Sequence, residues 1–95
     1  MIRNVVLAKL KPGIPLEQVE RLTTELQGMQ IPGMINLSVG TDAGLREGNM
    51  DVVIVTDLDD EDAYRRYDAD PEHNRIRREI VAPITERIER IQYRV

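Results

Sequence analysis

The spacing of apolar residues changes along the chain between the period of a strand and the period of a helix. Residues 2–10, 34–41 and 50–58 are rich in β-forming side chains, and the apolar positions of residues 91–95 recur at every second residue. These four stretches are predicted to be strands. A helix is predicted over residues 15 to about 28, where an apolar stripe recurs at steps of three and four: Leu16, Val19, Leu22, Leu26 and Met29.

The second helical region is interrupted and is expected to contain two helices. Asp59 is expected to cap the first of them, which then runs to about Ala69. Asp70 is predicted to cap the next helix, with Pro71 at its first helical position, where the missing N–H costs nothing. Pro83 is expected to interrupt that helix after about three turns. Its apolar stripe begins with His73 and continues through Ile76, Ile80, Ile84 and Ile88.

The order of these elements, β-α-β-β-α-β, predicts an α+β subunit of the ferredoxin-like type, whose helices cover one face of an antiparallel sheet. The second strand alternates, with Ile35, Leu37 and Val39 expected on one face. The first and third strands are apolar on both faces, and soluble monomers rarely leave such a face exposed. A homodimer is therefore predicted, in which the uncovered sheet faces meet in a barrel. The residues expected at this interface are Val5, Leu7, Val53 and Val55.

The composition argues against several classes of protein. The chain has 95 residues, which suits one domain spanning residues 1–95, and 41% of them are hydrophobic although Phe and Trp are absent. Its net charge of −4 argues against nucleic-acid binding. Without cysteine there is no disulfide or thiol nucleophile, and a lone histidine argues against a zinc site. No membrane span, signal peptide or phosphate-binding glycine motif is recognisable, so a cytoplasmic protein without metal or cofactor is predicted.

The candidate chemistry lies in residues 64–73, which hold the only histidine and two of the three tyrosines. His73 falls in the first turn of a predicted helix, where the positive end of the helix dipole favours the neutral imidazole. A neutral imidazole can accept a proton or donate a hydrogen bond, and Tyr67 is its expected partner in proton transfer. The competing interpretation is that His73 is a packed, hydrogen-bonded core residue without a chemical role.

Three stretches of the sequence resemble the stress-responsive A/B barrel domain (Dabb) family: residues 2–13, residues 31–33 and residues 67–73. The resemblance implies a dimeric α+β barrel. The family includes plant stress-induced proteins and a polyketide cyclase, in which a histidine after the proline-containing helix start acts as acid and base, aided by a tyrosine six residues earlier. His73 and Tyr67 stand at the matching positions. The family's frequent histidine on the first strand is replaced here by Asn4, and a common aromatic residue by Ala8.

Two functions follow from these residues and the resemblance. The first is a small dimeric protein that binds a small apolar or carbonyl-rich ligand between sheet and helices. The second is a cofactor-independent, polyketide cyclase-like lyase that uses His73 as acid and base with Tyr67, and cofactor-free oxidation is a weaker third. The residues expected to contact the ligand are Asn4, Val6, Ala8, Tyr67 and His73.

Overall fold

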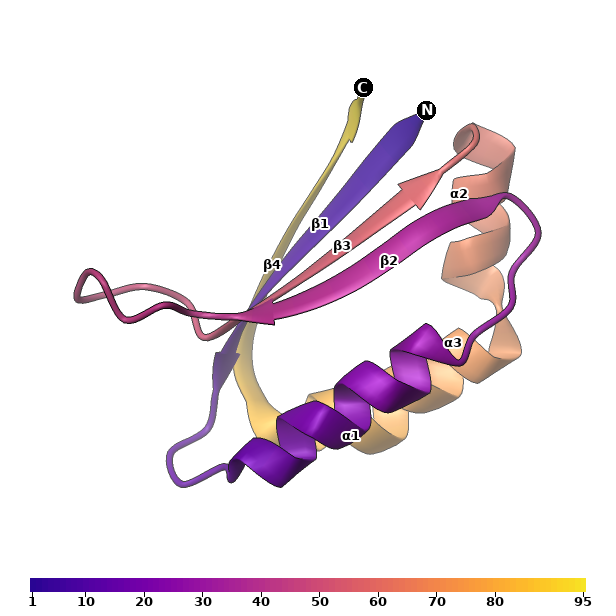
Figure 1. Ribbon diagram of the computed structural model, residues 1–95. Helices are drawn as coiled ribbons and strands as arrows, with labels where there is room; N and C mark the ends of the chain where they lie inside the picture. The colour runs from indigo at the N-terminus through magenta and orange to yellow at the C-terminus, as the bar shows by residue number, and fades with distance from the viewer.

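The computed structural model describes residues 1–95 as one four-stranded antiparallel sheet with helices on one of its faces (Figure 1). The strands follow the spatial order β2-β3-β1-β4. No helix is long and apolar enough to cross a membrane. The element order confirms the predicted ferredoxin-like α+β subunit. Its elements are β1 (Ile2–Leu10), α1 (Leu16–Gln27), β2 (Met34–Thr41), β3 (Val52–Leu58), α2 (Glu61–Ala69), α3 (Pro71–Ile76), the π-helical segment η1 (Arg77–Val81), the 3₁₀ turn η2 (Ala82–Ile84) and β4 (Thr85–Arg94).

Strand β1 lies at the centre of the sheet and pairs with β3 on one side and β4 on the other. Because side chains alternate along a strand, Asn4, Val6 and Ala8 face the helices, while Val5 and Leu7 face the opposite, open side. The register places Val6 opposite Ile54 of β3 and Arg90 of β4. Residues far apart in the sequence therefore share the helix-covered face.

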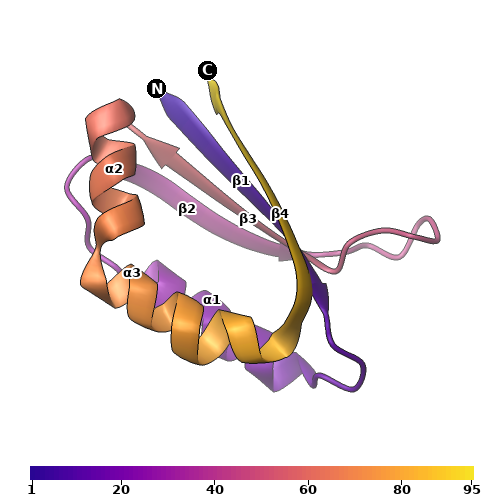
Figure 2. The same ribbon diagram turned by 180° about the vertical axis from the view of Figure 1, so that it is seen from behind.

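The hydrophobic core fills the space between the sheet and the helices. Helices α1 and α3 lie side by side across one end of the sheet, and α2 covers the opposite end (Figure 2). The predicted stripe of α1 is buried at Val19, Leu22 and Leu26, but Leu16 is 62% exposed. Pro15 is the extended N-cap of this helix rather than its first helical residue, so Leu16 opens the helix one turn before its buried stripe begins.

Strand β2 departs from the predicted alternation at its start. The register between β2 and β3 shifts between Met34 and Asn36, and this bulge leaves Ile35 without a partner on β3. Ile35 is consequently 56% exposed, whereas Leu37 and Val39 pack against the core. The prediction that Ile35 shares their face was wrong, because a bulge changes the side to which every preceding residue points.

The two helix starts were predicted with different success. Asp60, not Asp59, caps α2, and its carboxylate accepts a hydrogen bond from the Ala63 amide at 2.8 Å. Asp70 caps α3 as predicted, with its Oδ1 2.9 Å from the His73 amide nitrogen and Pro71 in the first turn. This cap holds His73 in the first turn of α3.

The C-terminal third differs from its prediction in two ways. The α-helical geometry ends at Ile76, before Pro83, because the chain continues as the wider turn η1, in which the Ala82 amide donates to the Arg77 carbonyl. Strand β4 begins at Thr85 rather than near Ile91, since it pairs along almost the whole of β1. These long-range backbone hydrogen bonds outweigh the weak local pattern.

The open face of the sheet has an apolar centre. Val5 lies between Val55 and Ile91, and Leu7 lies opposite Val53. Leu7 is 38% exposed and Ile91 is 59% exposed. Within one subunit this face has no cover, as the ribbon views show from both sides.

Candidate functional site

A small cavity of about 40 Å³ lies between the sheet and the helices. It has room for a few water molecules. Side chains of the sheet and of the three α-helices meet around it, together with the π-helical segment that follows α3. The lining residues are Val6, Ile54, Ile88 and Arg90 from the strands and Leu26, Tyr67, His73, Arg77 and Val81 from the helices.

The imidazole of His73 is held in one tautomer by the backbone. Its Nδ1 lies 2.8 Å from the carbonyl oxygen of Tyr67, and His73 is only 4% exposed. A carbonyl only accepts hydrogen bonds, so Nδ1 carries the proton and the neutral ring has its lone pair on Nε2. No side-chain or backbone group of the chain bonds Nε2. Nε2 is therefore the atom that His73 offers to a ligand.

The pKa of His73 is shifted so that the neutral form is favoured. Burial lowers this pKa because desolvation penalises the charged ring, and Arg77 acts in the same direction. The hydrogen bond to the Tyr67 carbonyl opposes the shift, as do the carboxylates of Asp68 and Asp70. The lowering dominates, so at neutral pH His73 is an uncharged base.

Tyr67 is stacked on His73 rather than hydrogen-bonded to it. The two ring centroids are 4.0 Å apart with the planes inclined by 35°. The Tyr67 hydroxyl accepts a hydrogen bond from Thr56 Oγ1 at 3.3 Å. Burial raises the pKa of Tyr67, so its hydroxyl stays protonated. The two predicted residues are brought together, but no hydrogen bond passes a proton directly between their side chains.

The other predicted ligand contacts divide into two groups. Val6 lines the cavity beside Tyr67 and His73. Asn4 and Ala8 do not: the Asn4 side-chain oxygen accepts a hydrogen bond from Gln92 at 2.8 Å, and Ala8 belongs to the hydrophobic core. The Asn4 side chain therefore serves as the hydrogen-bond acceptor for Gln92 on β4.

Two arginines at the cavity were not assigned to it by sequence reasoning. Arg77 belongs to η1, and Arg90 lies on β4 opposite Val6. The parity of β4 places Arg90 on the same face as Ile88, a signal that becomes readable only once the strand and its register are known. No cluster of three or more His, Cys, Asp or Glu residues capable of holding a metal ion is present.

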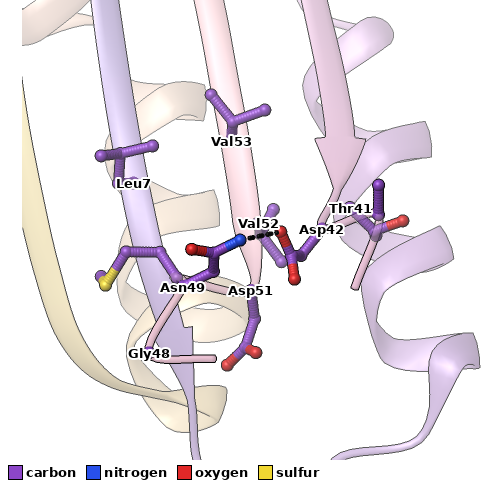
Figure 3. A pocket seen from close by; sticks show the side chains of 10 residues that line it. Leu7, Thr41, Asp42, Gly48, Asn49, Asp51, Val52 and Val53 are labelled. Carbon is purple, nitrogen blue, oxygen red and sulfur yellow. Dashed lines mark hydrogen bonds between the residues drawn. The ribbon is translucent and has the colours of Figure 1, made fainter. Parts of the chain in front are cut away.

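A second and larger hollow, of about 530 Å³, lies on the open face beside the β2–β3 connection (Figure 3). Leu7 and Val53 project into it from β1 and β3. At the rim of the hollow, the Asn49 side chain donates a hydrogen bond to the Asp42 carboxylate at 3.0 Å, which links the two ends of the β2–β3 connection. This hollow adjoins the apolar centre of the open face, so its shape depends on what covers that face.

The comparisons with known proteins agree with this architecture. The family model for the stress-responsive A/B barrel domain matches residues 2–95. A dimeric ferredoxin-like protein of unknown function from Thermobifida fusca is 33% identical over 99% of this chain and 90% of its own, with a TM-score of 0.90. A Dabb family protein from Mesorhizobium loti is 21% identical over 99% and 95% of the two chains, with a TM-score of 0.82.

A hydroxynitrile lyase from Passiflora edulis has the same fold, with 18% identity over 99% of this chain and 92% of its own and a TM-score of 0.85. A comparison with curated protein sequences finds no match. The family match over nearly the whole length, together with the fold, is decisive. The chain belongs to the stress-responsive A/B barrel domain family.

Proposed function

We propose that the protein is a homodimer in which each subunit binds a small molecule at the cavity beside His73. The observation that carries the ligand proposal is the unpaired Nε2 of a buried, neutral imidazole at a cavity. No fully buried side-chain nitrogen lacks a partner, so Nε2 is reached by water from the cavity, where a ligand can donate a hydrogen bond to it.

The dimer is supported by the open face of the sheet. Val5, Leu7, Val53 and Val55 share this face, and Leu7 is 38% exposed. A two-fold packing of these faces removes the exposed apolar surface from water, with the same patch contributed by each subunit. The T. fusca relative is described as dimeric, which supports the same assembly for this chain.

The size of the cavity favours a small ligand over a long one. Pockets for drug-sized molecules have volumes of about 300–1,000 Å³. The cavity at His73 measures about 40 Å³. A compound with a few heavy atoms fits this volume better than an extended polyketide does. A hydroxyl or an acidic C–H on that compound suits the site because Nε2 of His73 is a hydrogen-bond acceptor.

The alternative function is a lyase that uses His73 as its acid and base. The neutral ring with its free Nε2 supports it, because such a ring can remove a proton from a hydroxyl or an acidic C–H and return it later. The fold similarity to a hydroxynitrile lyase makes a small hydroxynitrile a reasonable first substrate to test. Tyr67 would stack on His73, and its hydroxyl, which accepts a hydrogen bond from Thr56, keeps its own proton to donate.

Nitrogen-15 NMR of the imidazole tests both functions. His73 is the only histidine, so its ring signals need no assignment by mutation. In the free protein we expect the Nδ1–H tautomer. Titration with glycolamide or acetone cyanohydrin should then move the Nε2 signal in a saturable manner, and release of acetone and hydrogen cyanide faster than in protein-free buffer would reveal lyase activity.

The control for this experiment is His73→Asn, whose side-chain amide can still donate to the Tyr67 carbonyl. This variant should remain folded by circular dichroism, should not bind the probes and should not release cyanide faster than protein-free buffer does. If the Nε2 signal is unchanged by these probes and by glycolate, the proposed ligand site is refuted. If binding occurs without cyanide release, the binding function stands and the lyase function on this substrate fails.

A further inference from the structure

The two arginines of the cavity differ in how their donors are used. The Arg77 guanidinium donates to the Asp68 carboxylate at 3.0 Å and to the Asn74 side-chain oxygen at 3.1 Å. The Arg90 side chain makes no hydrogen bond or ion pair with any group of the chain. The guanidinium donors of Arg77 are therefore bonded within its own subunit, whereas those of Arg90 have no partner in the chain and lie at the edge of the cavity.

The position of Arg90 follows from the sheet register. It lies directly opposite Val6, with its side chain on the helix-facing side of β4. Because β4 is an edge strand, Arg90 remains exposed while Val6 and Ile54 form an apolar floor beneath the helices. The cavity thus has a positive charge at its exposed edge, an apolar floor and the His73 acceptor among its walls.

The carboxylates near His73 form no ion pair with Arg90. Asp68 is bound by Arg77, and Asp70 accepts the hydrogen bond of the His73 amide at the start of α3. Elsewhere on β4, Arg87 pairs with Glu89 and lies on the alternate face from Arg90. The cationic group at the cavity edge is therefore left for an anion from outside the chain.

We propose that the cavity selects small 2-hydroxycarboxylates, with Arg90 as the residue that binds the carboxylate. This inference rests on the proposed function and names its ligand class. The guanidinium donates two parallel hydrogen bonds to a carboxylate, a geometry that a neutral amide cannot match. The adjacent hydroxyl donates to Nε2 of His73, which has a lone pair and no proton. A ligand with only one of these groups loses one of the two contacts.

The test compares three probes of nearly equal size. Glycolate has both groups, glycolamide lacks the charge and acetate lacks the hydroxyl. Dissociation constants are measured from the ¹⁵N signals of His73 in the wild-type protein, in Arg90→Gln and in the control Arg87→Gln, which removes the same charge from the other face of β4. We expect glycolate to bind at least about fivefold more tightly than glycolamide, which loses the charge-assisted contact with Arg90, and more tightly than acetate, which loses the hydrogen bond to His73.

The expected preference for glycolate over glycolamide depends on Arg90, whereas the preference over acetate depends on His73. Arg90→Gln should reduce glycolate binding to the level of glycolamide and leave glycolamide binding unchanged, whereas Arg87→Gln should keep the wild-type preference. Glycolamide binding as tightly as glycolate, or a preference over glycolamide that survives Arg90→Gln, overturns the carboxylate proposal but leaves the ligand site intact. If none of the three probes, nor acetone cyanohydrin, moves the Nε2 signal, both the site and its ligand class are refuted.

Discussion

The two faces of the sheet are formed by alternate residues of the same strands, yet they are completed in different ways. On the helix-covered face, Ala8 and Ile54 are buried in a core that the subunit provides for itself. On the open face, Leu7 and Ile91 are exposed although their neighbours are apolar. One face is covered within a single chain, and the other is left open for the proposed second copy.

Polar side chains are paired within the subunit on both faces. On the covered face the Asn4 side chain bonds Gln92, the Tyr67 hydroxyl bonds Thr56, and no fully buried side-chain nitrogen or oxygen lacks a partner. On the open face the Arg3–Asp57 ion pair, with Nε 2.7 Å from Oδ1, lies beside the apolar centre. The covered face combines core packing with the proposed ligand site at His73, whereas the open face is the proposed dimer interface.

The largest effect is expected from a charge on the covered face. Ala8 is 3% exposed in the core. Ala8→Glu should unfold the subunit, because an unpaired buried charge costs several kcal/mol, on the order of half the stability of a small domain. Circular dichroism during thermal unfolding checks this. A cooperative transition at the wild-type temperature would contradict the assignment of Ala8 to the core.

A charge on the neighbouring residue should separate assembly from folding. Leu7→Glu places its carboxylate on the open face, so the subunit should keep its helical circular dichroism but sediment as a monomer at micromolar concentration. Leu45→Glu, at a residue that is 89% exposed in the β2–β3 connection, is the matched control and should stay dimeric. Val53→Glu should behave like Leu7→Glu. A wild-type monomer, or a dimeric Leu7→Glu, would show that this face is not the interface.

A smaller effect is expected from the buried hydroxyl of the covered face. Tyr67→Phe deletes the acceptor of the Thr56 hydroxyl and should lower the free energy of unfolding by about 1–2 kcal/mol. Tyr64→Phe, on the same helix, loses no intramolecular hydrogen bond and should change stability little. Urea denaturation of both variants provides the measurement. Equal stabilities would mean that the Thr56–Tyr67 contact contributes nothing.

The smallest effect is expected from the protonation of His73. Its pKa in the folded protein is lowered, chiefly by burial, below the value of about 6.5 for an exposed histidine. The unfolded chain then binds this proton more readily, so stability is full above about pH 6.5 and declines as the pH falls towards the folded-state pKa. The free energy of unfolding measured between pH 5 and 8 should show this slope in the wild type and lose it in His73→Asn.

The carboxylates provide an internal check on that pH range. The pKa values of Asp57 and Glu72 are lowered by hydrogen bonds from Arg3 and Arg75, so their contribution is lost only at more acidic pH, below about 4. A decline of stability that begins near pH 6.5 is therefore assignable to His73. If His73→Asn shows the same decline, the burial of a neutral imidazole is not its cause.

The sequence alone determined the features that depend on a few neighbouring residues. The apolar periodicities predicted the order of the elements, and the Asp70–Pro71 pair placed His73 in the first turn of α3, as observed. The parity of β1 assigned Val5 and Leu7 to one face and Val6 to the other. The family resemblance drew attention to Tyr67 and His73, which the fold does bring into contact. These features are local because caps, breakers and strand alternation act within a few residues.

Only the tertiary structure decided the features that depend on register and packing. The bulge at Ile35 and the early start of β4 at Thr85 arise from pairing with strands distant in the sequence. The small volume of the cavity, the hydrogen bond between Thr56 and Tyr67, and the presence of Arg90 and His73 in the same cavity lining arise in the same way. Each joins residues of different elements, and their distances are set by how the helices pack on the sheet, which no local pattern in the chain records.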